Sequence, residues 1–238
     1  MLKNILKIIA VFFLGAIGGI FADQILWPYF IERPLFYKYR LEQAPVYVTE
    51  RKEIVIQENT ALQNAFDKVE KSVAGVRTTT KAGKTIDGSG LVVTSDGLVV
   101  TLADLVPKGE SYAFFLNGAS PSYQILKRDL ENNLALVKMD LNRIPTAGFV
   151  DLGKLRPGQR VFSVGVAFEE NDPYKIIEEG IIRAINENSI NTSITAGSVI
   201  KGSALFDIEG NVMGIYTVGS GGKASVISIE KIKEFVGF

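Results

Sequence analysis

The residues able to do chemistry in this chain are few in kind, because two of the usual catalytic types are missing. Among its 238 residues there is no His and no Cys. The missing thiols exclude disulfides, thiolate nucleophiles and metal sites built on Cys. The missing imidazole removes the commonest general base near neutral pH. Any reaction must therefore rely on Ser, Thr, Lys, Tyr and carboxylates.

One short stretch places a lysine close to a serine, in the order Lys201-Gly202-Ser203. Side chains two residues apart on an extended strand point the same way, so Lys201 could reach Ser203. A desolvated lysine with a lowered pKa can take the proton of a serine hydroxyl, and Ser198 is a second candidate nucleophile. A lysine that points into water, or that pairs with a carboxylate, stays charged and cannot act as this base. The residues alone leave all three interpretations of Lys201 open.

Carboxylates are the other candidate groups, since Asp and Glu oxygens bind hard cations. The positions considered are Asp104, Asp129, Glu131 and Asp140. Their spacing does not form the Asp-x-Asp-x-Asp-Gly loop that holds calcium. We therefore predict no metal and no cofactor.

The overall composition indicates a globular protein rich in short strands. Lys+Arg and Asp+Glu both number 26, so the balanced charge does not favour nucleic acid as a partner. Hydrophobic residues make up 47% of the chain, which is enough for a sizeable core. Glycine is frequent, at 23 residues, which is typical of strands joined by tight turns.

The N-terminus carries an uncharged apolar run, Ile8 to Ala22, with Lys3 and Lys7 before it and Asp23 after it. We predict an uncleaved transmembrane anchor over residues 1–27, because Ala22 makes a poor signal-peptide cleavage site. The two lysines predict a cytoplasmic N-terminus and an extracytoplasmic main domain. The membrane is thus one expected partner.

Beyond the anchor, the pattern predicts an extracytoplasmic stalk over residues 28–58 and one folded domain over residues 59–238. The stalk mixes aromatic residues, prolines and charges without a clear period. After Val73 the domain consists of short apolar runs separated by turns, which favours antiparallel barrels or a sandwich. The whole chain is therefore assigned to the all-β class, with short flanking helices.

Three local elements of this domain can be predicted in detail. The spacing of Leu62, Phe66 and Val69 predicts a short amphipathic helix from residue 59. The turn residues 207–210 lie between two apolar runs and predict a β-hairpin. The end of the chain, residues 228–238, predicts a last helix with one apolar face.

Four segments of the domain, in order and without gaps, resemble the HtrA family of trypsin-like serine proteases. The resemblance covers about 180 residues, from near Asn59 to the end of the chain, and it implies two six-stranded antiparallel β-barrels. Many members of that family carry a C-terminal PDZ domain, which this sequence does not show. The matching segments are GSGLVVTSDGLVVTLADLV (88–106), DLENNLALVKMD (129–140), LGKLRPGQRVFSVGVAF (152–168) and TSITAGSVIKGSALFDIEGNVMGI (192–215).

The same alignment implies that the catalytic residues of the family are replaced. Its His falls on Asp104, its Asp on Asn133 and its nucleophilic Ser on Lys201. The glycine that helps to form the oxyanion hole falls on Val199, and β-branched Val disfavours the backbone such a hole often needs. The specificity residue after Thr192 is Ser193, where the family has Asp.

The resemblance therefore implies a catalytically inactive, membrane-anchored homologue, a pseudoprotease that binds or assembles other proteins. Asp104 and Lys201 would face each other across the cleft between the barrels and could pair there, and Asn133 could bond to Asp104. Active members bind extended peptides by strand addition and frequently form homotrimers, so an extended peptide or protein partner and a trimer are expected. The alternative is a divergent serine endopeptidase in which Lys201 activates Ser203.

Overall fold

The structure is a computed structural model that describes residues 2–27, 58–186, 189–195, 200–219 and 224–238. The described residues belong to two units, one before residue 56 and one from residue 56 onward. The predicted stalk, 28–58, lies outside the described residues except for Glu58. The boundaries predicted for the anchor, the stalk and the folded domain stay predictions.

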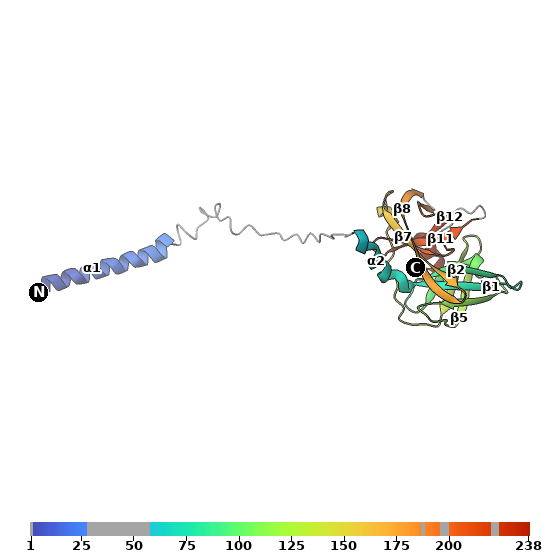
Figure 1. Ribbon diagram of the computed structural model, residues 1–238. Helices are drawn as coiled ribbons and strands as arrows, with labels where there is room; N and C mark the ends of the chain where they lie inside the picture. The colour runs from blue at the N-terminus through green and yellow to red at the C-terminus, as the bar shows by residue number, and fades with distance from the viewer. Residues whose placement is uncertain (1, 28–57, 187–188, 196–199, 220–223) are drawn as a thin grey trace. The chain divides into compact units, whose positions relative to one another are not determined.

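The first unit contains a long apolar helix (Figure 1). Helix α1 spans Leu2–Phe21 and continues into a π-helical turn, η1, at Ala22–Leu26. The segment Lys3–Leu26 has a mean hydropathy of 2.4, and its apolar side chains are exposed. Its 24 residues rise about 36 Å at 1.5 Å per residue, which is enough to cross the hydrocarbon core of a bilayer. By length and composition this helix can span a membrane.

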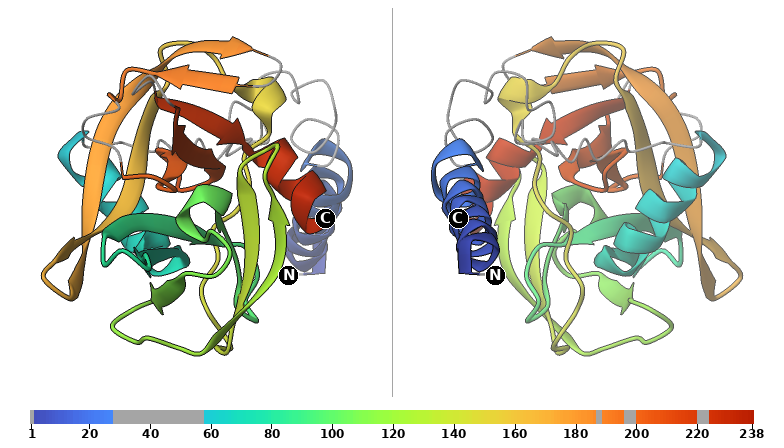
Figure 2. Two further views of the ribbon diagram at one scale, coloured as in Figure 1. Left: turned by 90° about the vertical axis from the view of Figure 1, so that its right-hand side faces the viewer. Right: turned by 90° about the vertical axis from the view of Figure 1, so that its left-hand side faces the viewer.

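The second unit is built from two six-stranded antiparallel sheets (Figure 2). The first sheet has the order β4-β1-β2-β3-β6-β5, and the second is a closed barrel in the order β10-β11-β12-β9-β8-β7. The strands are β1 (Val73–Thr79), β2 (Thr85–Val92), β3 (Leu98–Leu102), β4 (Ser111–Phe115), β5 (Tyr123–Asp129), β6 (Leu134–Met139), β7 (Arg160–Glu169), β8 (Asp172–Asn186), β9 (Ser189–Thr192), β10 (Ala204–Asp207), β11 (Val212–Val218) and β12 (Ala224–Ser228).

The predicted all-β fold with two six-stranded antiparallel sheets is confirmed, and the first sheet is a half-barrel beside the closed barrel of the second. Its edge strands β4 and β5 are not paired along their backbones. Aromatic side chains bridge them instead: the Tyr123 ring lies 4.6 Å from that of Phe114, and Tyr123 Oη donates to the Tyr112 carbonyl at 3.0 Å. A bulge near Leu126 bends β5. These aromatic contacts join β4 to β5 without backbone pairing.

The two predicted helices of this unit are present, and their apolar faces are buried as expected. Helix α2 spans Glu58–Val69, and Val69 is fully buried in the main core. Helix α3 spans Ile229–Val236 and ends at Gly237, which has the left-handed φ of 97° that glycine adopts readily. Figure 2 shows α3 beside the β5–β6 hairpin. Three short 3-10 turns complete the unit, namely η4 (Glu70–Ser72), η5 (Ala103–Leu105) and η6 (Leu152–Lys154).

The predicted hairpin is formed by β10 and β11, and its turn is held by a carboxylate. Asp207 Oδ1 accepts hydrogen bonds from the backbone N–H groups of Glu209 and Asn211, at 3.0 and 2.8 Å. Gly210 adopts a φ of 83° and packs against α2 at Val69. The hairpin begins just after Lys201 and thus fixes where that residue lies in the second barrel.

Candidate functional site

The three residues that the sequence alignment predicts at the triad positions come from three separate elements of the second unit. Asp104 lies in η5, directly after β3. Asn133 is the last residue of the turn between β5 and β6, and Lys201 lies in the turn that precedes β10. The first two positions belong to the half-barrel and the third to the closed barrel, so contacts among them join the two halves.

Lys201 and Asp104 form an ion pair, as the sequence led us to expect. Lys201 Nζ lies 2.9 Å from Asp104 Oδ2. The two side chains are 39% and 38% exposed, so water screens the attraction, and a pair of this kind contributes about 1 kcal/mol or less. This arrangement suits a contact between two halves and opposes a role for Lys201 as a base.

Asn133 holds Asp104 in place through the backbone. Its Oδ1 accepts a hydrogen bond from the Asp104 N–H at 2.9 Å, and its carbonyl accepts one from the Ala103 N–H at 3.1 Å. Its Nδ2 donates to Thr217 Oγ1 on β11 at 3.3 Å. The φ of Asn133 is 53°, a left-handed value that Asn tolerates better than most residues. The predicted bond between Asn133 and Asp104 is therefore present, but it goes to the backbone N–H.

The turn that carries Lys201 is tied to the half-barrel. The Lys201 carbonyl accepts a hydrogen bond from the Ser89 N–H at 2.8 Å. Gly202 adopts a φ of 78° and lies so close to Ser89 that an added Cβ would overlap the Ser89 carbonyl oxygen. The Gly202 N–H donates to the Tyr216 carbonyl at 2.8 Å. Only glycine fits this position without displacing one of the two sheets.

Ser203 is buried in the wall of the closed barrel. Its exposed fraction is 1%, and its hydroxyl lies against the backbone of Gly165 on β7, where an added Cβ would overlap it. Its N–H donates to the Ile200 carbonyl at 3.0 Å. The hydrogen bond that the structure shows for the Lys201 ammonium goes to Asp104. The other candidate nucleophile, Ser198, and the oxyanion-hole position, Val199, lie outside the described residues.

Two further groups could in principle take a proton, and their surroundings argue against both. Burial raises the pKa of Tyr216 to about 12, and its hydroxyl bonds to Thr192 Oγ1 at 2.6 Å. Burial lowers the pKa of Lys175 to about 8, partly offset by Glu70, but its ammonium donates to the Val73 carbonyl. The Tyr216 hydroxyl is thus protonated at neutral pH. Lys175, on β8, is bonded to β1 and so belongs to another contact between the closed barrel and the half-barrel.

Of the carboxylates considered for a metal, Asp129 is used in a turn. Its Oδ2 accepts from the Asn132 side-chain amide at 2.8 Å, and its Oδ1 accepts from the backbone N–H groups of Glu131 and Asn132, both at 3.0 Å. These bonds, above all the one from the Asn132 side chain, lower the pKa of Asp129. Among the residues that the structure describes, no cluster of three or more ligating side chains occurs. Ser193 also has a backbone role, because its Oγ accepts from the Ile181 N–H at 2.9 Å.

Sequence reasoning missed two residues that hold the site together. Ser89 is buried; its Oγ accepts from the Val166 N–H on β7 at 2.8 Å, and its carbonyl accepts from Thr101 Oγ1 at 2.7 Å. Thr217 receives the Asn133 amide. The Gly88-Ser89-Gly90 motif could have pointed to Ser89, since two flanking glycines permit close approach of another backbone. Nothing in the sequence singles out Thr217.

The comparisons with known proteins agree with this fold. Residues 88–215 match the family described as the trypsin-like peptidase domain. The chain belongs to this family. The match runs from within β2 to within β11, and Asp104, Asn133 and Lys201 lie inside it.

This trypsin-like domain is similar to HtrA-type proteins. It is similar to a probable periplasmic serine endoprotease, DegP-like, of Halomonas elongata, with 28% identity over 137 residues. That stretch is 54% of this chain and 28% of the relative, so the chain spans little more than a quarter of that protein. Among solved structures, the HtrA-type protease AlgW with a tripeptide is 24% identical, with a TM-score of 0.65 over 74% of this chain and 62% of that one. A substituted form of AlgW with a tripeptide gives 23% identity and the same score and coverage.

Proposed function

We propose that this protein is a catalytically inactive HtrA-type homologue, anchored in a membrane, that binds an extended peptide or protein partner. The observation that carries the proposal is the ion pair between Lys201 and Asp104, with Asn133 bonded to the Asp104 backbone. The three positions where a protease of this fold has its nucleophile, base and orienting group hold a structural contact between the two halves.

The chemistry supports inactivity. A serine hydroxyl becomes a nucleophile only when a held base takes its proton, and the chain contains no His. Loss of the nucleophile alone costs such an enzyme roughly 10⁶-fold in rate, or about 8 kcal/mol. A Ser–Lys mechanism at Ser203 would need the buried hydroxyl to leave Gly165 and the ammonium to leave Asp104. Both requirements favour the inactive interpretation.

An edge of β11 that no described strand pairs with supports peptide binding. The Tyr216 N–H donates to Ser203 and its carbonyl accepts from Gly202, so these groups face β10. Backbone groups alternate in direction along a strand, so the N–H and carbonyl of Val218 point to the same side as those of Tyr216. Val218 lies beyond the last residue pair of β10 with β11, which is Ala204 with Ile215. Within the described residues no strand pairs there. An extended peptide could add to this edge by main-chain hydrogen bonds, and AlgW structures with a tripeptide provide an analogy.

The setting of the protein follows from its first helix and its relatives. The apolar helix would anchor the chain, and Lys3 and Lys7 favour a cytoplasmic N-terminus. The folded unit would then lie on the extracytoplasmic side, which agrees with the periplasmic location in the name of the Halomonas relative. Assembly into a homotrimer, as in HtrA proteins, belongs to the same proposal.

Catalytic inactivity is tested with the full chain in lipid nanodiscs, incubated with an unfolded protein and with a fluorophosphonate probe. We expect neither cleavage nor covalent label, and the same result for Lys201→Ala and Ser203→Ala. Cleavage that disappears in Ser203→Ala would instead establish a divergent endopeptidase and identify Lys201 as its candidate base.

Peptide binding is tested by fluorescence anisotropy with a labelled library of extended peptides. Val218→Pro removes the N–H at this edge of β11 and leaves the pairing of Thr217 with Ser225 on β12. Val218→Ala is the matched control, because it keeps the N–H and loses only the side chain. We expect binding to weaken in the proline variant alone. Equal binding by both variants would show that β11 is not the docking edge.

A further inference from the structure

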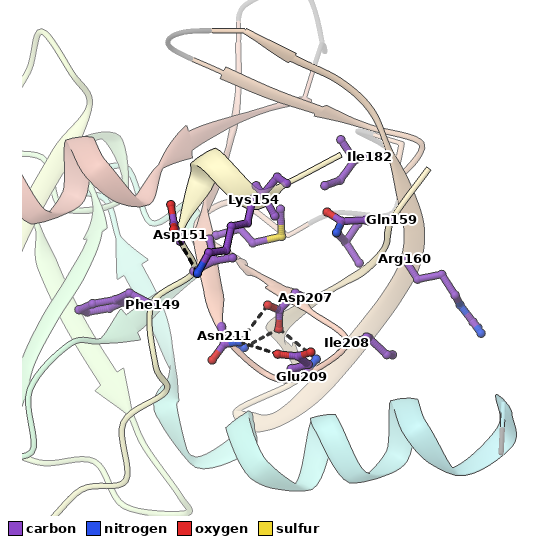
Figure 3. A pocket seen from close by; sticks show the side chains of 14 residues that line it. Phe149, Asp151, Lys154, Gln159, Arg160, Ile182, Asp207, Ile208, Glu209 and Asn211 are labelled. Carbon is purple, nitrogen blue, oxygen red and sulfur yellow. Dashed lines mark hydrogen bonds and ion pairs between the residues drawn. The ribbon is translucent and has the colours of Figure 1, made fainter. Parts of the chain in front are cut away.

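A cavity of about 460 Å³ lies at the end of the closed barrel, on the opposite end of β10 from Lys201. This volume is within the range of small-ligand pockets, and barrel mouths are common places for them. It is bounded by the connector before β7 on one side and by the β10–β11 turn on the other (Figure 3). None of the residues proposed for peptide binding lines it.

The floor of the cavity is apolar. Its accessible apolar surface comes from the half-buried Val150 and Ile208. Directly beneath lie side chains of the barrel core that are 5% exposed or less, namely Leu155, Val161, Ile182 and Met213. An apolar group placed on this floor would exchange water for contacts with close-packed side chains, which is favourable roughly in proportion to the area covered. The floor therefore selects a ligand with an apolar body.

The rim carries charges of both signs on opposite sides. Figure 3 shows Lys154 reaching from η6 on one side, with Asp207, Glu209 and Asn211 on the other, and Arg160 pointing away from the cavity. Lys154 is 84% exposed, and its Nζ is 3.5 Å from Asp151 Oδ2, a long ion pair. A ligand anion could therefore approach this ammonium.

On the opposite side of the cavity, the Glu209 carboxylate can accept further hydrogen bonds. Both oxygens of Asp207 hold the turn through Glu209 and Asn211. Glu209 Oε2 has only a 3.5 Å contact with Asn211 Nδ2. A ligand ammonium would thus meet Glu209, while a ligand carboxylate would meet Lys154.

We propose that this cavity is a binding site for a small zwitterion with an apolar side chain, that is, a free apolar amino acid or a dipeptide. The apolar side chain would lie against Val150 and Ile208, above Met213, while the carboxylate would face Lys154 and the ammonium would face Glu209. A purely cationic ligand would leave Lys154 unmatched, and a purely anionic one would face Glu209. The proposal stands independently of the peptide-binding edge on β11.

The test uses the full chain in lipid nanodiscs, labelled with ¹³C at the methionine methyl groups. Met213 lines the cavity, whereas Met139 is buried in the half-barrel and serves as the internal control. The probes are phenylalanine, phenethylamine and 3-phenylpropionate, which share a ring and a two-carbon chain. Phenylalanine carries both charges, phenethylamine only the positive charge and 3-phenylpropionate only the negative charge. We expect a saturable shift of the Met213 signal alone, with phenylalanine binding about two- to fivefold more tightly than either other probe.

Two variants separate the roles of the rim charges. Lys154→Gln should weaken phenylalanine and 3-phenylpropionate and spare phenethylamine, and Glu209→Gln should weaken phenylalanine and phenethylamine and spare 3-phenylpropionate. Glu230→Gln, exposed on α3, is the control and should change nothing. No saturable shift of Met213 with phenylalanine would overturn the proposal. Equal binding of all three probes would also overturn it, because the rim charges would then select nothing.

Discussion

The hydroxyl of Ser89 on β2 accepts a hydrogen bond from the backbone N–H of Val166 on β7, across the boundary between the two halves. Ser89 is fully buried, and its own N–H and carbonyl bond to Lys201 and to Thr101. This one residue therefore links the half-barrel, the closed barrel and the turn that carries Lys201. Its contacts explain why the two sheets keep a fixed relation at the candidate site.

Ser89→Ala should destabilise the folded unit. The substitution leaves the Val166 N–H buried without its acceptor, and an unsatisfied buried donor costs about 1–3 kcal/mol. The measurement is the free energy of unfolding in urea, followed by circular dichroism on the full chain. Ser111→Ala, at the exposed start of β4, is the control and should change it by less than about 0.5 kcal/mol. Equal values for the two variants would contradict the structural role of Ser89.

Gly202→Ala should be more destabilising than Gly83→Ala, although both glycines have a φ near 77°. A Cβ at Gly202 would overlap the Ser89 carbonyl, whereas nothing lies near Gly83. Gly83→Ala thus measures the left-handed backbone alone, about 1 kcal/mol. Gly202→Ala adds the steric clash, for which about 1–3 kcal/mol is typical of overpacking. Similar unfolding free energies for the two variants would show that the Lys201 turn is loosely held.

The ion pair of Lys201 and Asp104 should appear as a coupling in a double-mutant cycle. The variants are Lys201→Ala, Asp104→Ala and the double substitution. We expect a coupling free energy of about 0.2–1 kcal/mol, since both side chains are partly exposed, and a decrease at high salt. Strict additivity at low salt would mean that the pair contributes nothing to the contact between the halves.

The stability of the folded unit should rise with pH above about pH 8 because of Lys175. Burial lowers the pKa of this residue in the folded state to about 8, from its usual 10.5. Between these two values the unfolded chain binds one more proton than the folded one, so the free energy of unfolding increases with pH. At lower pH the charged ammonium is held in a partly buried place and opposes folding.

Lys175→Met checks this origin. The variant should flatten the rise in unfolding free energy between about pH 8 and 10.5 and should be more stable than the parent at neutral pH. Lys108→Met, at an exposed position, should keep the rise. A parent protein whose stability does not change across this range would show that Lys175 is not desolvated.

The secondary-structure elements and the limits on chemistry were predictable from the amino-acid sequence. Alternation and turn residues predicted the hairpin of β10 and β11, and helical spacing predicted α2 and α3, because these patterns depend on neighbours in the chain. The absence of His and Cys also follows from composition. The family pattern predicted which three positions would come together.

The way in which those positions interact depends on the packing of the two sheets. Lys201 and Asp104 are 97 residues apart, and their pairing depends on how the two sheets pack. The same packing buries Ser203 against Gly165, turns the Asn133 amide toward Thr217 and fills the open side of the half-barrel with Tyr123. Local sequence cannot specify such contacts, because each depends on the volume and backbone of segments far along the chain.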